Sequence, residues 1–251
     1  MSSRRADTYF RKGLSRWEDG HRLLEWGRPV WAARRYQQST LQFFGYVHET
    51  GWRPTAPPSH SARVFHGMGE LARQTAETLA GLGGRTRHTL RYARIAVAVT
   101  HLADPTRGDP FRIRFGAPAI GPPVFSLDPR SGEELTPHVR TASAAAARLY
   151  LARLMLGYPG YDDGERWPIG TGQRIFVTRE VARFRRAVLP SCVGLDHGAE
   201  ARRLADEAVA MYAGLCRVAP QYRDPARKAA AARAEIHACC PNTPDLDRRS
   251  R

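Results

Sequence analysis

The chain has 251 residues, of which 42% are hydrophobic, so it is long enough to bury a substantial core and is not a globally disordered polymer. Its 39 lysine and arginine residues outnumber its 24 acidic residues, giving a formal net charge of +15, and all but two of the cations, Lys12 and Lys228, are arginines. No run of about 18 apolar residues occurs, so the sequence excludes a membrane-spanning helix.

The excess of cations over carboxylates favours a polyanionic partner. Cations that bind a phosphate backbone release its counterions, and this release drives association. We therefore expect DNA or RNA as the partner and no membrane, although a basic protein without such a partner has the same composition. Residues 1–20 lack the apolar stretch of a secretory signal, so we expect a cytoplasmic protein.

All four cysteines lie in the last quarter of the chain, at Cys192, Cys216, Cys239 and Cys240. Their crowding does not resemble a disulfide framework. No C-x2-C pair occurs, and the adjacent Cys239 and Cys240 cannot easily both bind one zinc ion. We therefore expect reduced thiols, no metal and no cofactor.

Residues 1–107 are expected to form a four-helix bundle. Apolar periodicity predicts helices over residues 6–26, 29–49 and 60–81, and a fourth that ends before the DPTRGDP segment. The apolar residues of the first helix recur at helical spacing at Leu14, Trp17 and Leu24, together with His21. The large apolar residues of the second helix are Trp31, Tyr36, Leu41, Phe43, Phe44 and Val47.

Residues 108–140 differ from the helical segments before them. The runs FRIRFG and PPVFSLDPRSGEELTPHV are short, β-like and interrupted by glycine and proline. The DPRSG sequence is typical of a turn. We expect a small hairpin or an irregular β-containing insert here.

A C-terminal helical region is expected over residues 141–240. Strong helix formers predict a helix over residues 141–156, and two alanine-rich helices follow within 197–240. Asp224 followed by Pro225 is a typical start for the second of these. Residues 241–251 are expected to be a flexible tail.

The sequence RYARIAVAVTH at residues 91–101 is expected to be a helix with two different sides. Tyr92, Ile95, Val99 and Leu102 lie on the side predicted to face the core. Arg91, Arg94 and His101 lie on the other side, which we expect to be exposed or to face a partner subunit. An arginine and a histidine on one face can meet one phosphate, where the arginine holds the charge and the histidine exchanges a proton. An ordinary solvated face is the alternative.

Residues 6–105 resemble the HEPN superfamily of helical bundles. The resemblance lies in the helix order, in the aromatic second helix of LLEWGRPVWAARRYQQSTLQFFGYVHETGW, in HSARVFHGMGEL and in the following Arg-x6-His spacing. It implies a dimerising bundle that is a metal-independent endoribonuclease or a non-catalytic relative. If the catalytic motif carries over, it falls on Arg94 and His101.

Two arginine-rich segments are candidate nucleic-acid-binding surfaces. In residues 171–188, Thr178 can cap a helix whose arginine stripe consists of Arg179, Arg183 and Arg186, with Arg185 beside it. The second segment, RTRHTLRYAR, contributes Arg85, Arg87 and Arg91. A stripe of arginines suits a phosphate backbone, and a solvated charged face is again the alternative.

The sequence thus predicts a mainly α-helical protein that binds nucleic acid without catalysis, associated with a replicon, a plasmid or a defence system. One alternative is a HEPN-like endoribonuclease. The other is a helical protein-interaction scaffold.

Overall fold

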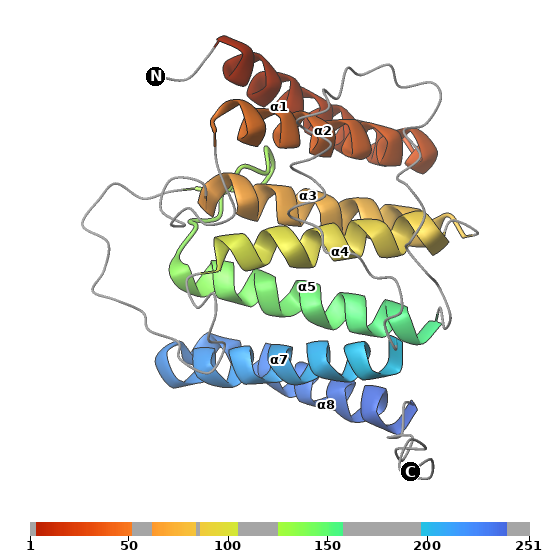
Figure 1. Ribbon diagram of the computed structural model, residues 1–251, viewed down its shortest axis with the longest axis vertical. Helices are drawn as coiled ribbons and strands as arrows, with labels where there is room; N and C mark the ends of the chain where they lie inside the picture. Colours follow the sequence, from red (N-terminus) through yellow and green to blue (C-terminus); the bar gives the residue numbers. More distant parts are fainter. Residues whose placement is uncertain (1–3, 52–61, 84–85, 105–124, 158–196, 240–251) are drawn as a thin grey trace, which may run out of the picture.

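A computed structural model describes residues 4–51, 62–83, 86–104, 125–157 and 197–239. Within these ranges the chain forms seven α-helices and one short 3-10 helix (Figure 1). The α-helices are α1 (Arg4–Glu25), α2 (Pro29–Glu49), α3 (Ala62–Gly81), α4 (Thr86–Ala103), α5 (Pro137–Gly157), α7 (His197–Val218) and α8 (Arg223–Cys239), and the 3-10 helix is η1 (Pro220–Tyr222). The expectation of a mainly α-helical protein is confirmed for the described residues.

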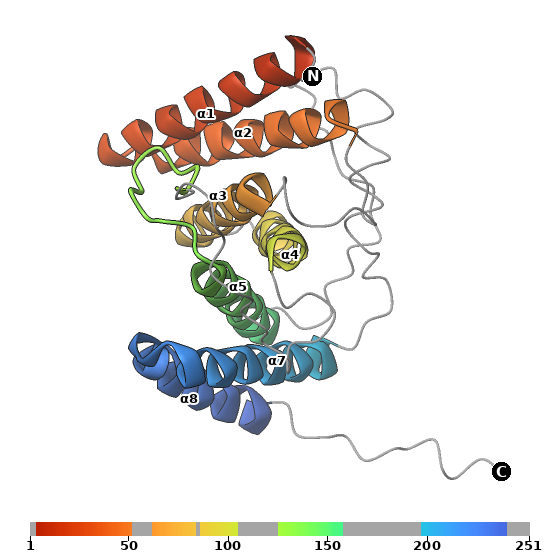
Figure 2. The same ribbon diagram turned by 90° about the vertical axis from the view of Figure 1, so that its left-hand side faces the viewer.

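The helices stack in chain order from one end of the molecule to the other. Figures 1 and 2 show the α1–α2 pair at one end, α3, α4 and α5 in the middle, and the α7–α8 pair at the opposite end. Each helix packs mainly against the helices before and after it in the sequence. The four-helix bundle expected for residues 1–107 is not confirmed, because α1 packs chiefly on α2 whereas α4 packs chiefly on α3 and α5.

One hydrophobic core runs through the stack. It contains Trp17 of α1, Phe43 of α2, Met68 of α3, Val99 of α4, Leu151 of α5, Leu204 of α7 and Ile236 of α8. A smaller cluster around Met211, Tyr212 and Leu215 joins α5, α7 and α8. Burial of these side chains is the main source of stability for helices that have little intrinsic stability alone.

The turn between α1 and α2 is a Schellman motif. The Arg28 N–H donates to the Leu23 carbonyl at 2.8 Å, and the Gly27 N–H donates to the Leu24 carbonyl at 2.9 Å. Gly27 has a φ of 65°, which suits a residue without a Cβ. Pro29 then begins α2, where its missing N–H costs nothing. The two helices are therefore held in a defined antiparallel hairpin.

The expected β-containing insert is described only from residue 125 onward. Phe125 and Glu134 form an isolated antiparallel bridge, and there is no strand among the described residues. The Ser131 N–H donates to the Asp128 carbonyl at 3.0 Å, so the turn expected from DPRSG is confirmed. Residues 108–124 of the expected insert lie outside the described residues.

The first helix begins at Arg4 rather than at residue 6, and two helix starts after residue 107 also differ from those expected. Helix α5 begins at Pro137 rather than at residue 141, because Thr136 caps it by accepting a hydrogen bond from the Val139 N–H at 3.2 Å. Helix α8 begins one residue before Asp224, which lies in the first turn. The 171–188 segment and the 241–251 tail lie outside the described residues. No helix in the described ranges is long and apolar enough to cross a membrane.

Candidate nucleic-acid interface

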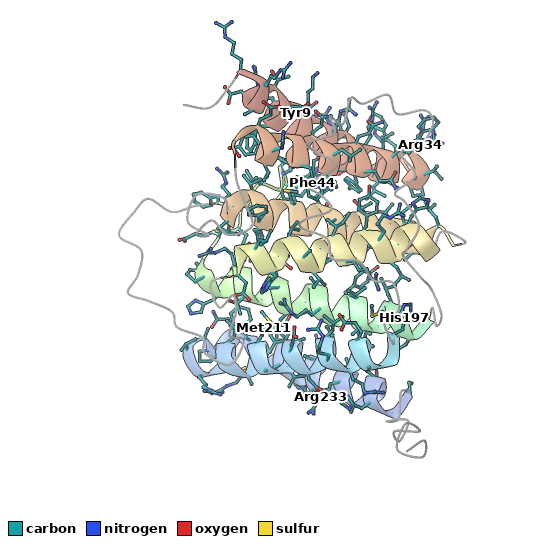
Figure 3. The ribbon with its side chains drawn as sticks, in the orientation of Figure 1. Tyr9, Arg34, Phe44, His197, Met211 and Arg233 are labelled. Carbon is teal, nitrogen blue, oxygen red and sulfur yellow. The ribbon has the colours of Figure 1, made fainter. Side chains whose placement is uncertain are left out.

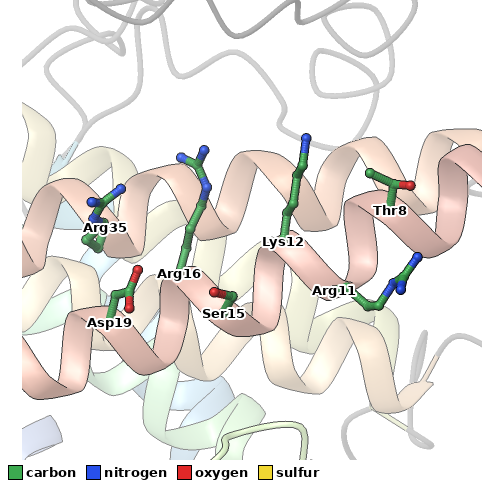
Figure 4. A pocket seen from close by; sticks show the side chains of 7 residues that line it. All are labelled: Thr8, Arg11, Lys12, Ser15, Arg16, Asp19 and Arg35. Atoms are coloured by element: carbon green, nitrogen blue, oxygen red, sulfur yellow. The ribbon is translucent and has the colours of Figure 1, made fainter.

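A shallow groove on the outer surface of the α1–α2 hairpin collects positive charge. Its cations are Arg11, Lys12, Arg16 and Arg35, named here the groove cations. Figure 4 shows Lys12 and Arg16 extending from the same side of α1, with Arg35 of α2 beside Arg16. Thr8 and Ser15 add hydroxyl groups, and Asp19 is the only carboxylate among the described residues that line the groove.

The helical period of α1 explains why these side chains share one face. Lys12 and Arg16 are four residues apart, so they lie one turn apart on the same side. The buried Gly13, Trp17 and Gly20 lie on a neighbouring side of α1, and Gly20 is only one turn from Arg16. Lys12 is therefore exposed, whereas Arg16 is half-buried at the edge of the side that α2 covers.

Arg16 and Arg35 share one neutral acceptor. The Arg16 Nη1 donates to the Gln38 Oε1, and the Arg35 Nη1 donates to the same oxygen at 3.2 Å. Burial lowers the pKa of Arg16, and repulsion from Arg35 lowers it further. The nearby Asp19 raises the pKa, but by less. An arginine stays protonated at physiological pH after such a shift, so two cations remain close together in the groove.

None of the groove cations forms an ion pair with a carboxylate in the described part of the chain. Several exposed cations at the other end of the stack do form such pairs. Arg203 pairs with Glu200 and Glu207, and Arg227 and Lys228 pair with Asp224. The groove therefore offers positive charge that an anionic ligand can neutralise.

Two tryptophans at the end of the hairpin are exposed. Trp26 is 66% exposed and Trp31 is 54% exposed. The sequence pattern grouped Trp31 with the large apolar residues of the second helix, but the structure places it at the surface. The signal that could have revealed them is the WGRPVW sequence, which puts a tryptophan on each side of a glycine–proline turn.

Helix α4 confirms one expectation for RYARIAVAVTH and overturns another. The segment is a helix, and Ile95, Val99 and Leu102 are buried. However, Arg91 is also buried, at 2% exposed, so it is not available to a nucleic acid as expected. At about 100° per residue, Arg91 lies only about 20° from Leu102, and α3 and α5 pack on α4 from two sides. The expectation of a solvent-facing side on this helix was therefore wrong for Arg91.

Arg94 and His101 are half-buried on α4, about 10.5 Å apart along the helix axis. The Arg148 Nη2 of α5 lies 3.3 Å from the His101 Nδ1. Because arginine can only donate, Nδ1 acts as the acceptor and the ring proton is on Nε2. Arg148 itself is buried and pairs with Glu207 of α7 at 2.8 Å. The only lone pair of the neutral His101 ring therefore faces a guanidinium.

The remaining expected nucleic-acid contacts cannot be placed. Arg85 and the stripe of Arg179, Arg183, Arg185 and Arg186 lie outside the described residues. Arg87 lies in the first turn of α4, but its side chain is not among those described.

Two of the four cysteines can be located. Cys216 and Cys239 are free thiols, whereas Cys192 and Cys240 lie outside the described residues. In the described ranges no three His, Cys, Asp or Glu side chains gather in an arrangement that could hold a metal ion.

A hydrogen-bonded network joins the 125–134 turn to the hairpin. The Asp128 carboxylate accepts hydrogen bonds from the His21 Nε2 at 3.1 Å and from the Gln74 Nε2 at 2.9 Å. The His21 Nδ1 accepts from the Tyr36 hydroxyl at 3.1 Å, and the Trp17 Nε1 donates to the Gln74 Oε1 at 2.8 Å. Tyr36 is fully buried, and this chain of polar groups joins α1, α2 and α3 to the turn.

No protein-family model matches the chain, and searches among curated proteins and among solved structures return no match. The resemblance of residues 6–105 to the HEPN superfamily stays a prediction. The function is therefore inferred from the chemistry of the residues alone.

Proposed function

We propose that this protein binds nucleic acid without cleaving it, and that the groove cations contact the phosphate backbone. The observation that carries the proposal is the grouping of these cations on one outward face with no carboxylate partner among the described residues. Phosphate contacts by arginine and lysine supply most of the affinity of sequence-independent binding. The net charge of +15 adds long-range attraction for a polyanion.

A salt titration tests the proposal. In the variant Arg11→Gln, Lys12→Gln, Arg35→Gln, three exposed cations are removed and the half-buried Arg16 is kept. The affinity for single-stranded and duplex oligonucleotides should fall at low salt. The slope of log K against log salt should become shallower by up to about 2 to 3 units, because each phosphate contact contributes about 0.7 to 0.9.

A matched control removes the same charges from the other end of the stack. The variant Arg217→Gln, Arg227→Gln, Lys228→Gln also lacks two arginines and one lysine, all exposed. It should keep the wild-type slope. Equal changes in the two variants would show that net charge alone matters and would contradict a role for the groove. If no nucleic acid binds at low salt, the helical protein-interaction scaffold is the better interpretation.

The HEPN-like endoribonuclease is the alternative, at Arg94 and His101. The helical conformation of α4 supports this alternative, because it places the Arg94 and His101 side chains on one face of the helix. A general base needs a free lone pair, but that of His101 faces Arg148. RNA incubated with the wild-type protein and a chelator should stay intact. Cleavage that is lost in His101→Ala would instead establish the enzyme.

A further inference from the structure

The two exposed tryptophans form an aromatic surface that phosphate binding alone does not use. Trp26 and Trp31 lie within six residues of each other, and each leaves more than half of its surface in water. Tryptophan is enriched at interfaces, where its large ring is buried by a partner.

The backbone places both tryptophans on the same face as the groove. The Trp26 N–H donates to the Arg22 carbonyl at 3.0 Å, so the last turn of α1 extends to Trp26. Trp26 follows Asp19 by seven residues, which at 100° per residue leaves only about 20° between them. Trp31 precedes Arg35 by four residues, or about one turn of α2. The aromatic rings therefore continue the groove toward the α1–α2 turn.

One arginine lies over the Trp31 ring, and another lies in the turn between the two tryptophans. The Arg34 guanidinium lies 4.9 Å from the centroid of the Trp31 ring, and Arg34 extends at the turn end of the hairpin in Figure 3. Arg28, in the turn between the two tryptophans, is exposed. Trp31 keeps 54% of its surface exposed in the presence of this cation–π contact, so part of it stays accessible to a second flat group. The surface thus combines positive charge with a platform for stacking.

We propose that Trp26 and Trp31 stack on unpaired bases of a single-stranded nucleic acid while the groove cations bind its phosphates. This inference rests on the proposed function and narrows its ligand. A duplex already stacks its base faces internally, so it cannot use the indole rings, whereas a single strand exposes both features. An apolar protein surface would match the rings but not these arginines.

The test compares ligands on the full chain. Fluorescent oligothymidylate, oligouridylate and a duplex of equal length are titrated at fixed salt with the wild type and with Trp26→Ala, Trp31→Ala. Single-strand affinity should fall about tenfold for each ring removed, as is typical of base–aromatic stacking. Duplex affinity should change by less than about twofold, and the salt slope should not change, because no phosphate contact is lost. The oligothymidylate and oligouridylate arms show whether DNA or RNA is preferred.

Two controls separate stacking from folding. Phe125→Ala removes another exposed aromatic ring, 48% exposed and outside the hairpin, and should leave single-strand affinity unchanged. Trp31→Phe keeps a flat ring and should retain most of the affinity. Equal losses on single strand and duplex, or no loss on either, would overturn the stacking proposal. Either result would leave the salt-dependent role of the groove intact, whereas the absence of any binding would overturn the proposed function itself.

Discussion

At the scale of single residues, Asp128 holds three parts of the chain together. Its carboxylate accepts hydrogen bonds from His21 of α1, from Gln74 of α3 and from the backbone N–H of Arg130 at 3.0 Å. Burial raises the pKa of Asp128, but the hydrogen bonds outweigh burial and hold the pKa below its ordinary value. Burial, and then the Asp128 charge, raise the pKa of Tyr36, so its hydroxyl stays protonated and donates to His21.

Asp128→Asn should therefore destabilise the protein in a pH-dependent way. A carboxyl group whose pKa is depressed in the folded state contributes stability above its unfolded pKa and loses that contribution as the pH falls through the folded value. At about pH 7 the variant should be less stable by about 1 to 3 kcal/mol, as expected for a lost hydrogen bond to a charged group. At about pH 3 or below the difference should shrink. Urea unfolding at both pH values measures it.

Glu235→Gln is the control for this pH dependence. Glu235 is an exposed carboxylate at the far end of the stack, and its contact with Arg153 is long, at 3.7 Å. Its effect should be small at both pH values. A constant difference between Asp128→Asn and the wild type across the pH range would contradict the assigned role of the Asp128 charge.

At the scale of elements, glycines set the spacing of the α1–α2 hairpin. A Cβ on Gly20 would lie 2.3 Å from the Cε1 of Tyr36, whereas a Cβ on Gly81 at the end of α3 would meet nothing within 4 Å. The ring of Tyr36 thus packs directly on the backbone of α1. This close approach also brings Tyr36 within reach of His21.

Gly20→Ala should accordingly destabilise the protein, by about 1 to 3 kcal/mol, because the added methyl overpacks the helix interface. Gly81→Ala adds the same methyl group to a helix in open space and should be neutral or stabilise by up to about 1 kcal/mol. Thermal or urea unfolding of the two variants distinguishes them. Destabilisation of equal size in both would show that Gly20 does not fix the helix spacing.

The sequence predicted the helices well because their apolar periodicity is strong. The 29–49 helix was predicted with both of its observed ends, since Pro29 and the segment after Glu49 mark them clearly. The start of α5 was missed because TPHV has β-like composition, although Thr136 followed by Pro137 is also a capping signal. Periodicity measures local amphipathicity, whereas the start of α5 is marked by a capping hydrogen bond.

The candidate site was harder to predict. Arg91 is buried in the folded chain, and α3 and α5 both pack on α4; these contacts join segments that are separate in the sequence. The groove cations were overlooked because they are spaced among Thr8, Ser15 and Asp19 and form no dense arginine run. Arg35 joins them only because α2 folds back along α1.

At the scale of the whole molecule, the groove cations differ in their partners from several cations at the opposite end of the stack. The α1–α2 end presents the groove cations and the two exposed tryptophans. At the α7–α8 end, described cations such as Arg203 and Arg233 are paired with acidic neighbours, Arg233 with Asp206. The proposed function therefore predicts that a nucleic acid contacts the α1–α2 end of the described residues. Cations also occur elsewhere along the chain.

The most direct test of this account is photo-crosslinking of the full-length protein to a short single-stranded oligothymidylate, followed by mass spectrometry of the crosslinked peptides. We predict crosslinks within residues 4–35, with Trp26 or Trp31 among the modified positions, and their loss in Arg11→Gln, Lys12→Gln, Arg35→Gln. Crosslinks confined to other parts of the chain, with none in residues 4–35, would contradict the assignment of the α1–α2 hairpin as the nucleic-acid interface.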